Sequence, residues 1–268
     1  MPATPAKEAA MGASSISPAV VVGIDGSRPA LCAAAWAVPE AVFRDLPLRL
    51  IYVIEPATGA VDPQTRFEMA RSALAEAQSV VVAADQQVDV EFEILEGKTM
   101  TRLCEASSSA VMVCIGAGER PARSDGFTAP ALIAAAICPV AVIRCWTSPV
   151  NPPAVDHVVA EADNGVVLRC AFEEARLRVA PLRILARTLP DDRDRRGRVQ
   201  LDRRVARWAR LYPDVVVETV EVAVGARRYC PDAQRPNQLM VTQNFGRSEI
   251  ADAHRAGFSV IAVRPNLA

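Results

Sequence analysis

Short apolar runs rich in β-branched residues alternate with longer amphipathic segments along the first half of the chain. A continuous apolar run that ends in turn residues is typical of a strand buried on both faces, as in a parallel sheet covered by helices. The pattern predicts strands at 20–24, 48–54, 88–95, 111–115 and 140–143, and helices at 28–43, 65–85, 97–106 and 129–136. Five β–α steps with short links indicate a doubly wound parallel sheet.

The second half of the chain repeats this pattern. WAVPEAVFRDLPLRLIYV at 36–53 matches AFEEARLRVAPLRILAR at 171–187, and CPVAVIR at 138–144 matches FSVIAVR at 258–264. A period of about half the chain indicates two copies of one domain. The second copy also contains a helix ending at Leu211, and its spacing places Leu201, Val205, Trp208 and Leu211 on one face.

These features divide the chain into four parts. We expect a disordered tail at 1–17, a first domain at 18–146, a linker at 147–154 and a second domain at 155–268. The tail is rich in Ala, Pro and Ser, a composition that buries little apolar surface. The linker holds three prolines, which favour an extended chain.

Composition narrows the classes of function. The 268 residues carry a net charge of −1, which argues against broad electrostatic binding of nucleic acid or an anionic membrane. Aspartates interleave with the arginine-rich stretch at 193–210, so we interpret it as a solvated surface. The longest apolar run, 129–143, contains two prolines and is too short to span a bilayer.

The cysteines and histidines give no sign of a metal site or a disulfide framework. None of the seven cysteines forms a C-x-x-C pair, and the chain has only two histidines. Several cysteines lie inside apolar runs, where a thiol behaves as a small hydrophobic group. We therefore expect a cytoplasmic protein, without a metal site, whose thiols are reduced and mostly buried.

Three motifs occur in a diagnostic order: VVVGIDGS at 20–27, PLRLIYVIEP at 47–56 and CPVAVIR at 138–144. Together they resemble the universal stress protein family, and the duplication resembles its tandem two-domain form. The resemblance implies an α/β fold of two tandem Rossmann-like domains, each a five-stranded parallel sheet flanked by helices. It also implies that the fifth strands, here 140–143 and 260–263, pair antiparallel and form an intramolecular pseudo-dimer. That pairing would cover two apolar sheet edges that otherwise invite aggregation.

Many members of the family bind ATP, and the resemblance maps a site onto the first domain. Asp25 matches the aspartate at the adenine or ribose, and Val53 matches the valine that lines the adenine pocket. Gly116 and Gly126 match the first and third glycines of a phosphate loop, G-x2-G-x9-G-[S/T], and Thr128 lies next to its hydroxyl position. Such glycines let backbone N–H groups approach phosphate oxygens. The expected ligand is ATP, accompanied by Mg.

The loop also departs from the family pattern. Glu119 replaces the second glycine, Phe127 replaces the Ser or Thr, and the loop is about three residues short. A carboxylate facing phosphates disfavours binding unless a cation intervenes. Each of these residues also has an explanation that needs no ligand. Asp25 can equally cap a helix, Val53 can be an ordinary core residue, and the glycines can be turn positions. The second copy retains only Gly246 in a still shorter loop, so we expect no ATP there.

The sequence contains no Walker loop, no G-x-S-x-G elbow and no plausible Cys–His pairing, so we expect no enzyme. The leading hypothesis is a stress-response regulatory module with a degraded ATP-type pocket, acting through a ligand or an unidentified regulatory protein. A ligand-free interaction scaffold is the alternative, and a slow ATP hydrolase has the least support. The pseudo-dimer can also form a homodimer through other surfaces.

Overall fold

Strands and helices alternate along the first half of the described chain. The computed structural model of the protein describes residues 17–56, 62–84, 87–117, 129–161, 164–188, 195–223, 237–243, 253 and 257–264. The first half contains β1 (Ala19–Ile24), α1 (Arg28–Arg44), β2 (Leu48–Ile54), α2 (Pro63–Ala83), β3 (Val90–Glu96), α3 (Thr99–Ala106), β4 (Ala110–Ala117), α4 (Ala129–Ala135) and β5 (Val140–Arg144). The second half contains β6 (His157–Glu161), α5 (Gly165–Leu177), β7 (Leu182–Thr188), α6 (Arg195–Leu211), β8 (Val217–Ala223), β9 (Gln238–Thr242) and β10 (Phe258–Ala262).

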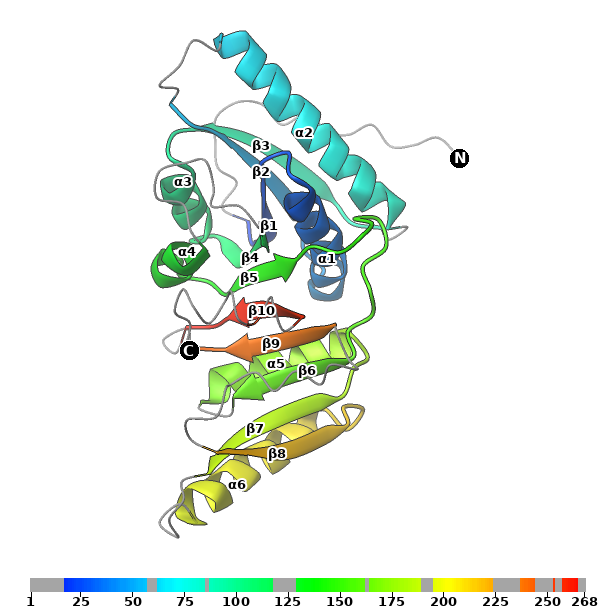
Figure 1. Ribbon diagram of the computed structural model, residues 1–268, viewed down its shortest axis with the longest axis vertical. Coiled ribbons are helices and arrows are strands. Elements are labelled where there is room, and N and C mark those ends of the chain that lie inside the picture. Colours follow the sequence, from blue (N-terminus) through cyan, green and yellow to red (C-terminus); the bar gives the residue numbers. More distant parts are fainter. Residues whose placement is uncertain are drawn as a thin grey trace.

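The strands form one continuous sheet in the order β3-β2-β1-β4-β5-β10-β9-β6-β7-β8 (Figure 1). Within each half, every pair of neighbouring strands is parallel. The predicted fold class, two tandem five-stranded Rossmann-like domains paired as a pseudo-dimer, is confirmed. Residues 145–156 connect β5 to β6, and the division at 147–154 stays a prediction, as does the tail, most of which lies outside the described residues.

The two halves meet where β5 pairs antiparallel with β10. The partners are Val142 with Val260, Ala141 with Ile261, and Val140 with Ala262. Val140 and Val260 are matching positions of the two copies, so the register centres a pseudo-twofold axis on the Ala141–Ile261 pair. The side chains of this junction are almost fully buried. Each strand therefore gives the other the partner that an edge strand lacks.

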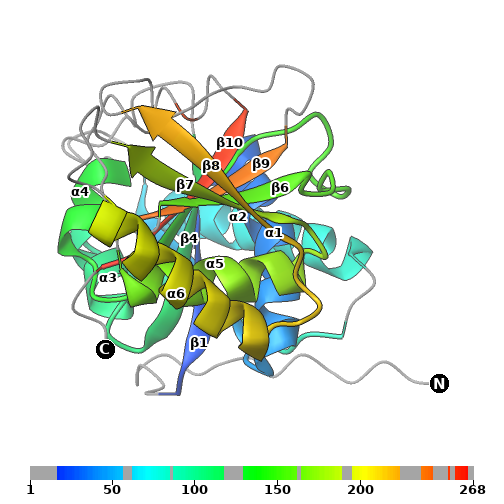
Figure 2. The same ribbon diagram turned by 90° about the horizontal axis from the view of Figure 1, so that it is seen from below.

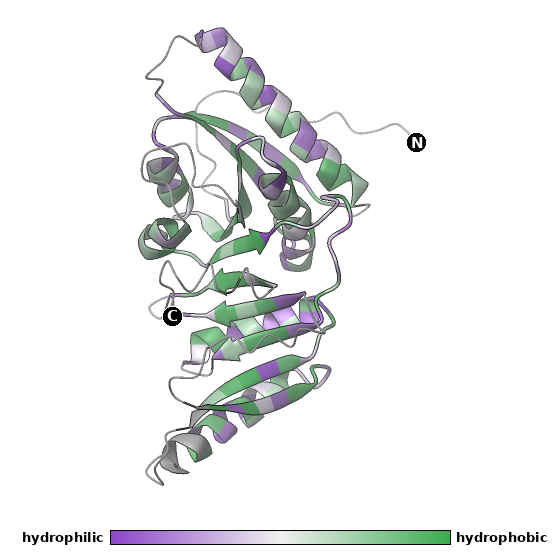
Figure 3. Ribbon diagram, viewed as in Figure 1, coloured by the Kyte–Doolittle hydropathy of each residue, from purple (hydrophilic) through white to green (hydrophobic). Residues whose placement is uncertain are grey.

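Helices cover both faces of the sheet in the first half. Residues of α1 and α2 pack with those of α5 and α6 in one hydrophobic cluster that extends across both halves. Residues of α3 and α4 pack on the opposite face. Figure 2 shows α5 and α6 together beneath the strands of the second half. Apolar colouring dominates the central strands, whereas α2 alternates between polar and apolar positions (Figure 3).

The predicted apolar face of α6 needs one correction. Leu211 is 61% exposed, whereas Leu201, Val205 and Trp208 pack against the core, as does Tyr212. At about 100° per residue, position 211 lies roughly 80° from Leu201, while position 212 returns to within roughly 20°. Tyr212 therefore takes the place predicted for Leu211, and its ring centroid lies 5.6 Å from that of Phe172.

Four charged residues connect α1 to α5 beside the junction. Glu40 and Arg44 on α1 match Glu174 on α5 and Arg178 directly after it in the second copy, and both glutamates are fully buried. Arg44 forms ion pairs with Glu40 and, at 3.3 Å, with Glu174. Arg178 forms ion pairs with Glu40 and, at 3.7 Å, with Glu174. Each arginine thus bridges the glutamates of both domains, which satisfies charges that would be costly to bury alone.

The surroundings of this cluster favour the neutral form of one glutamate. Burial, followed by the nearby Glu40 carboxylate, raises the pKa of Glu174 well above its ordinary value, against the opposing effect of Arg178 and Arg44. The Arg178 guanidinium also lies 4.1 Å from the centre of the Trp36 ring, a cation–π contact across the domain boundary. Glu174 therefore titrates within a cluster whose ion pairs and cation–π contact join the two domains.

We expect Glu174→Gln to flatten the pH dependence of stability. The folded state retains a proton that the unfolded chain loses above about pH 4.5, so this glutamate makes the free energy of unfolding fall as pH rises from there towards neutrality. Gln keeps the shape but does not titrate. Urea unfolding at a series of pH values measures the effect, with the half-buried neighbour Glu173→Gln as the control. An unchanged profile in Glu174→Gln would contradict the prediction.

The junction predicts how the first domain behaves alone. A fragment of residues 1–148 exposes the β5 edge, and we expect it to self-associate in light-scattering measurements. In the full chain, Val142→Lys places a charge in the buried junction and should lower the free energy of unfolding by about 3 kcal/mol. Val82→Lys on α2 is the control, because Val82 is 69% exposed. A strictly monomeric fragment and an unaffected Val142→Lys protein would exclude this role for β5.

Candidate functional site

Asp25 forms a tight turn at the carboxyl end of β1. Its Oδ1 accepts a hydrogen bond from the Ser27 N–H at 2.9 Å, and Gly26 between them adopts a φ of +76°, which favours glycine. Ser27 then caps α1, and its Oγ accepts a hydrogen bond from the Ala30 N–H at 3.4 Å. The turn leaves the Asp25 side chain exposed at the edge of the sheet where open α/β proteins bind ligands.

Gly116 allows the first turn of α1 to pack directly on β4. A Cβ atom at this position would lie only 2.2 Å from the carbonyl carbon of Pro29 and 2.6 Å from the Ala30 nitrogen. No other residue fits without moving the helix. Gly116 therefore brings the start of α1 against the start of the predicted phosphate loop.

Val53 lies near the end of β2 and packs, half-buried, against the core on the α3–α4 face. Since β2, β1 and β4 are adjacent, Val53, Asp25 and Gly116 lie at the ends of three neighbouring strands. Three of the five predicted site residues thus meet at one edge. Gly126 and Thr128 lie outside the described residues, as do the departures Glu119 and Phe127.

Acidic side chains follow or end each of the first three strands at this edge, namely Asp25, Glu55 and Glu96. Glu55 Oε1 accepts a hydrogen bond from the Thr99 N–H at 3.0 Å and so caps α3. Burial, and then the Asp25 charge, raise the pKa of Tyr52 beside them. Such an edge favours hydrogen-bond donors or a cation over a bare phosphate.

Nearby arginines are already engaged. Arg28 donates to the carbonyl oxygen of Trp146 at 2.8 Å, and Arg66 donates to that of Glu55 at 3.2 Å. Arg144, at the end of β5, donates to Asn237 Oδ1 at 3.2 Å and joins the two halves. Within the part of the chain that the structure describes, no group of three or more His, Cys, Asp or Glu side chains is placed to hold a metal ion.

The equivalent edge of the second half is filled by its own side chains. Strand register aligns Glu161 with Gly23 and Gln243 with Gly116. Glu161 is buried and accepts a hydrogen bond from Thr242 Oγ1 at 2.9 Å. Asn164 caps α5 and donates to Gln243. An alignment of the two copies by strand register finds this difference, whereas the sequence match through the helices is displaced, because α5 has 13 residues where α1 has 17.

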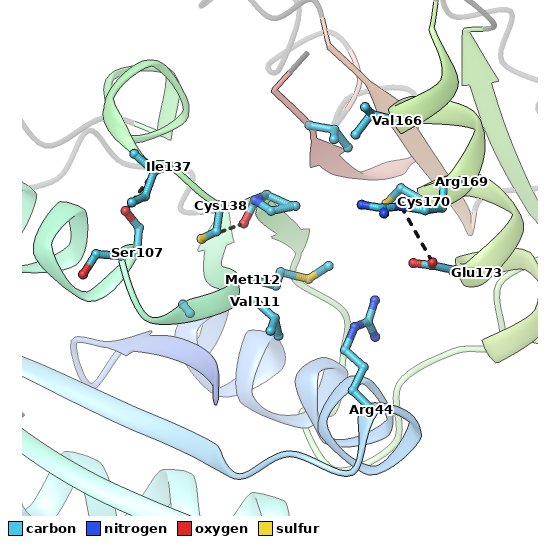
Figure 4. A pocket seen from close by; sticks show the side chains of 14 residues that line it. Arg44, Ser107, Val111, Met112, Ile137, Cys138, Val166, Arg169, Cys170 and Glu173 are labelled. Atoms are coloured by element: carbon cyan, nitrogen blue, oxygen red, sulfur yellow. Dashed lines mark hydrogen bonds and ion pairs between the residues drawn. The ribbon is translucent and has the colours of Figure 1, made fainter. Parts of the chain in front are cut away.

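A separate cavity of about 410 Å³ lies between the two halves. Its lining includes the start of β4 and the residues just before β5, so it lies at the opposite edge of the first sheet from Asp25. Figure 4 shows Arg169 and Glu173 on one side of it and Ile137 and Cys138 on the other. Its polar groups already have partners, because Arg169 pairs with Glu173 at 4.0 Å and Arg44 belongs to the buried charge cluster.

Among the helices that the structure describes, none is both long and apolar enough to cross a bilayer. The paired parallel sheets and the helices that cover them define the class of protein. It is a tandem Rossmann-like protein, in which two α/β halves share one sheet.

Comparisons with known proteins agree with this class. Residues 18–144 match the model of the universal stress protein family. A universal stress protein of Mycobacterium tuberculosis is 46% identical over 258 residues, covering 92% of this chain and 96% of the relative. A second one from the same organism is 43% identical over 221 residues, covering 76% of this chain and 78% of that protein. The chain therefore belongs to the universal stress protein family, and the predicted resemblance is confirmed.

A solved structure supports the same fold over both halves. The crystal structure of a universal stress protein from Archaeoglobus fulgidus matches with a TM-score of 0.65 and covers 92% of this chain and 96% of that chain. Sequence identity over the match is 13%. At this level the similarity shows the shared architecture alone.

We expect Gly116→Ala to destabilise the protein by about 3 kcal/mol, because the new methyl group would overlap the Pro29 backbone rather than a movable side chain. Gly165→Ala is the matched control, since a Cβ there meets nothing within 4 Å, and its effect should stay within about 0.5 kcal/mol. Chemical denaturation of both variants measures the difference. Equal stability of the two variants would contradict the close packing of α1 on β4.

Proposed function

We propose that this universal stress protein is a stress-response regulatory module whose first domain binds an adenine nucleotide. The observation that carries the proposal is the meeting of Asp25, Val53 and Gly116 at the ends of three adjacent strands. The family resemblance assigns these positions to the nucleotide, and the described structure leaves the Asp25 carboxylate exposed. The same edge of the second half carries Glu161 and Gln243 instead.

Each residue has a role that its position supports. Asp25 Oδ1 is engaged with the backbone, so Oδ2 would accept a hydrogen bond from a ribose hydroxyl or the adenine amino group. Val53 would provide an apolar wall for the base. Gly116 would start the loop that contains Gly126 and Thr128 and carries backbone N–H groups to the phosphates.

The charges of the edge favour ATP together with Mg rather than ATP alone. Asp25, Glu55 and Glu96 would repel free phosphates, and Arg28 and Arg66 already bind backbone carbonyls. A divalent cation offsets this repulsion. Nucleotide binding would then alter the surface offered to an unidentified regulatory protein, with no chemical step required.

The test is a calorimetric titration of the full chain with ATP, with and without Mg. We expect saturable binding that requires Mg, and Asp25→Ala should weaken it by about 1–3 kcal/mol, the cost of an unsatisfied buried partner. Asp163→Ala is the matched control, because the duplication places Asp163 at the corresponding corner of the second copy. Its affinity should equal that of the unaltered protein.

Each other outcome identifies a different function. An absence of binding in the correctly folded protein would favour the ligand-free scaffold. Binding that survives Asp25→Ala but is lost in Asp163→Ala would move the site to the second domain. Phosphate release above the buffer background would indicate an ATP hydrolase.

A further inference from the structure

Two cysteines that are far apart in the sequence are in contact near the start of α1. Cys32 lies in the second turn of α1, and Cys145 directly follows β5. Their Sγ atoms are 3.3 Å apart. Cys32 is fully buried, whereas Cys145 is half-buried, so the pair is closed on one side and accessible on the other.

We propose that Cys32 and Cys145 are a redox modification site, which a hydroperoxide converts into a reversible intramolecular disulfide. A disulfide requires the sulfurs to approach to about 2.0 Å, so they must move closer by roughly 1.3 Å. The two sulfur atoms are already in contact, so this short approach is the movement that bond formation requires. The proposal does not depend on nucleotide binding.

The environment assigns different roles to the two thiols. Burial is the main reason that the pKa of Cys32 is raised to about 12, and this disfavours Cys32 as the attacking thiolate. Cys145 is the more accessible thiol. The Arg28 guanidinium donates to the carbonyl of the next residue, Trp146, and so places a positive charge near the pair. Cys145 is therefore the thiol that meets the oxidant, and Cys32 resolves the product.

The chemistry balances in two steps. The Cys145 thiolate attacks one oxygen of hydrogen peroxide, the O–O bond breaks, and Cys145 becomes a sulfenic acid as hydroxide leaves. The Cys32 sulfur then attacks the Cys145 sulfur, the S–O bond breaks, and water leaves with the thiol proton. Overall, two thiols and one hydrogen peroxide give one disulfide and two waters, and a dithiol reductant reverses the change.

The new bond would connect the site edge to the linker. Cys32 lies one turn beyond Pro29, whose backbone packs on Gly116, and Cys145 begins the segment that leads to the second domain. The loop closed between them contains almost the whole first domain. Oxidation would thus fix α1 against the end of β5 and restrict the unfolded chain, which should raise the thermal midpoint.

The experiment treats the full-length protein with hydrogen peroxide, alkylates the remaining thiols under denaturing conditions and maps the products by mass spectrometry. We expect a peptide pair joined through Cys32 and Cys145 that is lost after dithiothreitol, together with a higher thermal midpoint for the oxidised protein. Cys104→Ser is the matched control, because Cys104 is also half-buried, and it should form the same link.

Variants of the pair separate its two roles. In Cys32→Ala, which suits a fully buried position, dimedone should trap a sulfenic acid at Cys145. In Cys145→Ser, Cys32 should stay reduced under the same treatment. Quantitative alkylation of both cysteines in the oxidised unaltered protein, or links from either of them to other cysteines, would overturn the proposal. Selective oxidation of Cys32 in Cys145→Ser would overturn the assigned order of attack.

Discussion

The antiparallel pairing of β5 with β10 is the constraint on which the rest of the structure depends. Each strand would otherwise be an open apolar edge of a five-stranded sheet. Joining them makes one ten-stranded sheet and brings α1 beside α5 on the same face. The hydrophobic core on that face is consequently continuous across both domains, so neither domain retains its full core without the other.

The pseudo-twofold axis explains why the buried charges occur in pairs. Because Glu40 and Glu174 are equivalent positions near the axis, the junction brings two carboxyl groups together, and Arg44 and Arg178 each contact both of them. Symmetry thus creates both the repulsion and its compensation. The raised pKa of Glu174 shows that burial and the second carboxylate outweigh the arginines.

The two copies agree at the junction and differ at the carboxyl edge. Gly23 and Gly116 in the first copy correspond by register to Glu161 and Gln243 in the second, where side chains occupy the space. The strand ends of the first copy therefore carry glycines where those of the second copy carry hydrogen-bonded polar side chains. Arg28 connects the carboxyl edge of the first copy to the segment that leads to the second. It begins α1 and donates a hydrogen bond to the carbonyl oxygen of Trp146, just before the linker.

The sequence by itself determined the features that depend on residues close together in the chain. Apolar runs located β2 at its observed bounds, the duplicated CPVAVIR and FSVIAVR motifs located the fifth strand of each copy, and the family resemblance implied that these two strands pair. Only the tertiary structure decided which helical glutamates are buried, that Gln243 replaces a packing glycine, and that Cys32 contacts Cys145. These features join residues that are distant along the chain, and the order and register of the strands, rather than any local pattern, decide which of them meet.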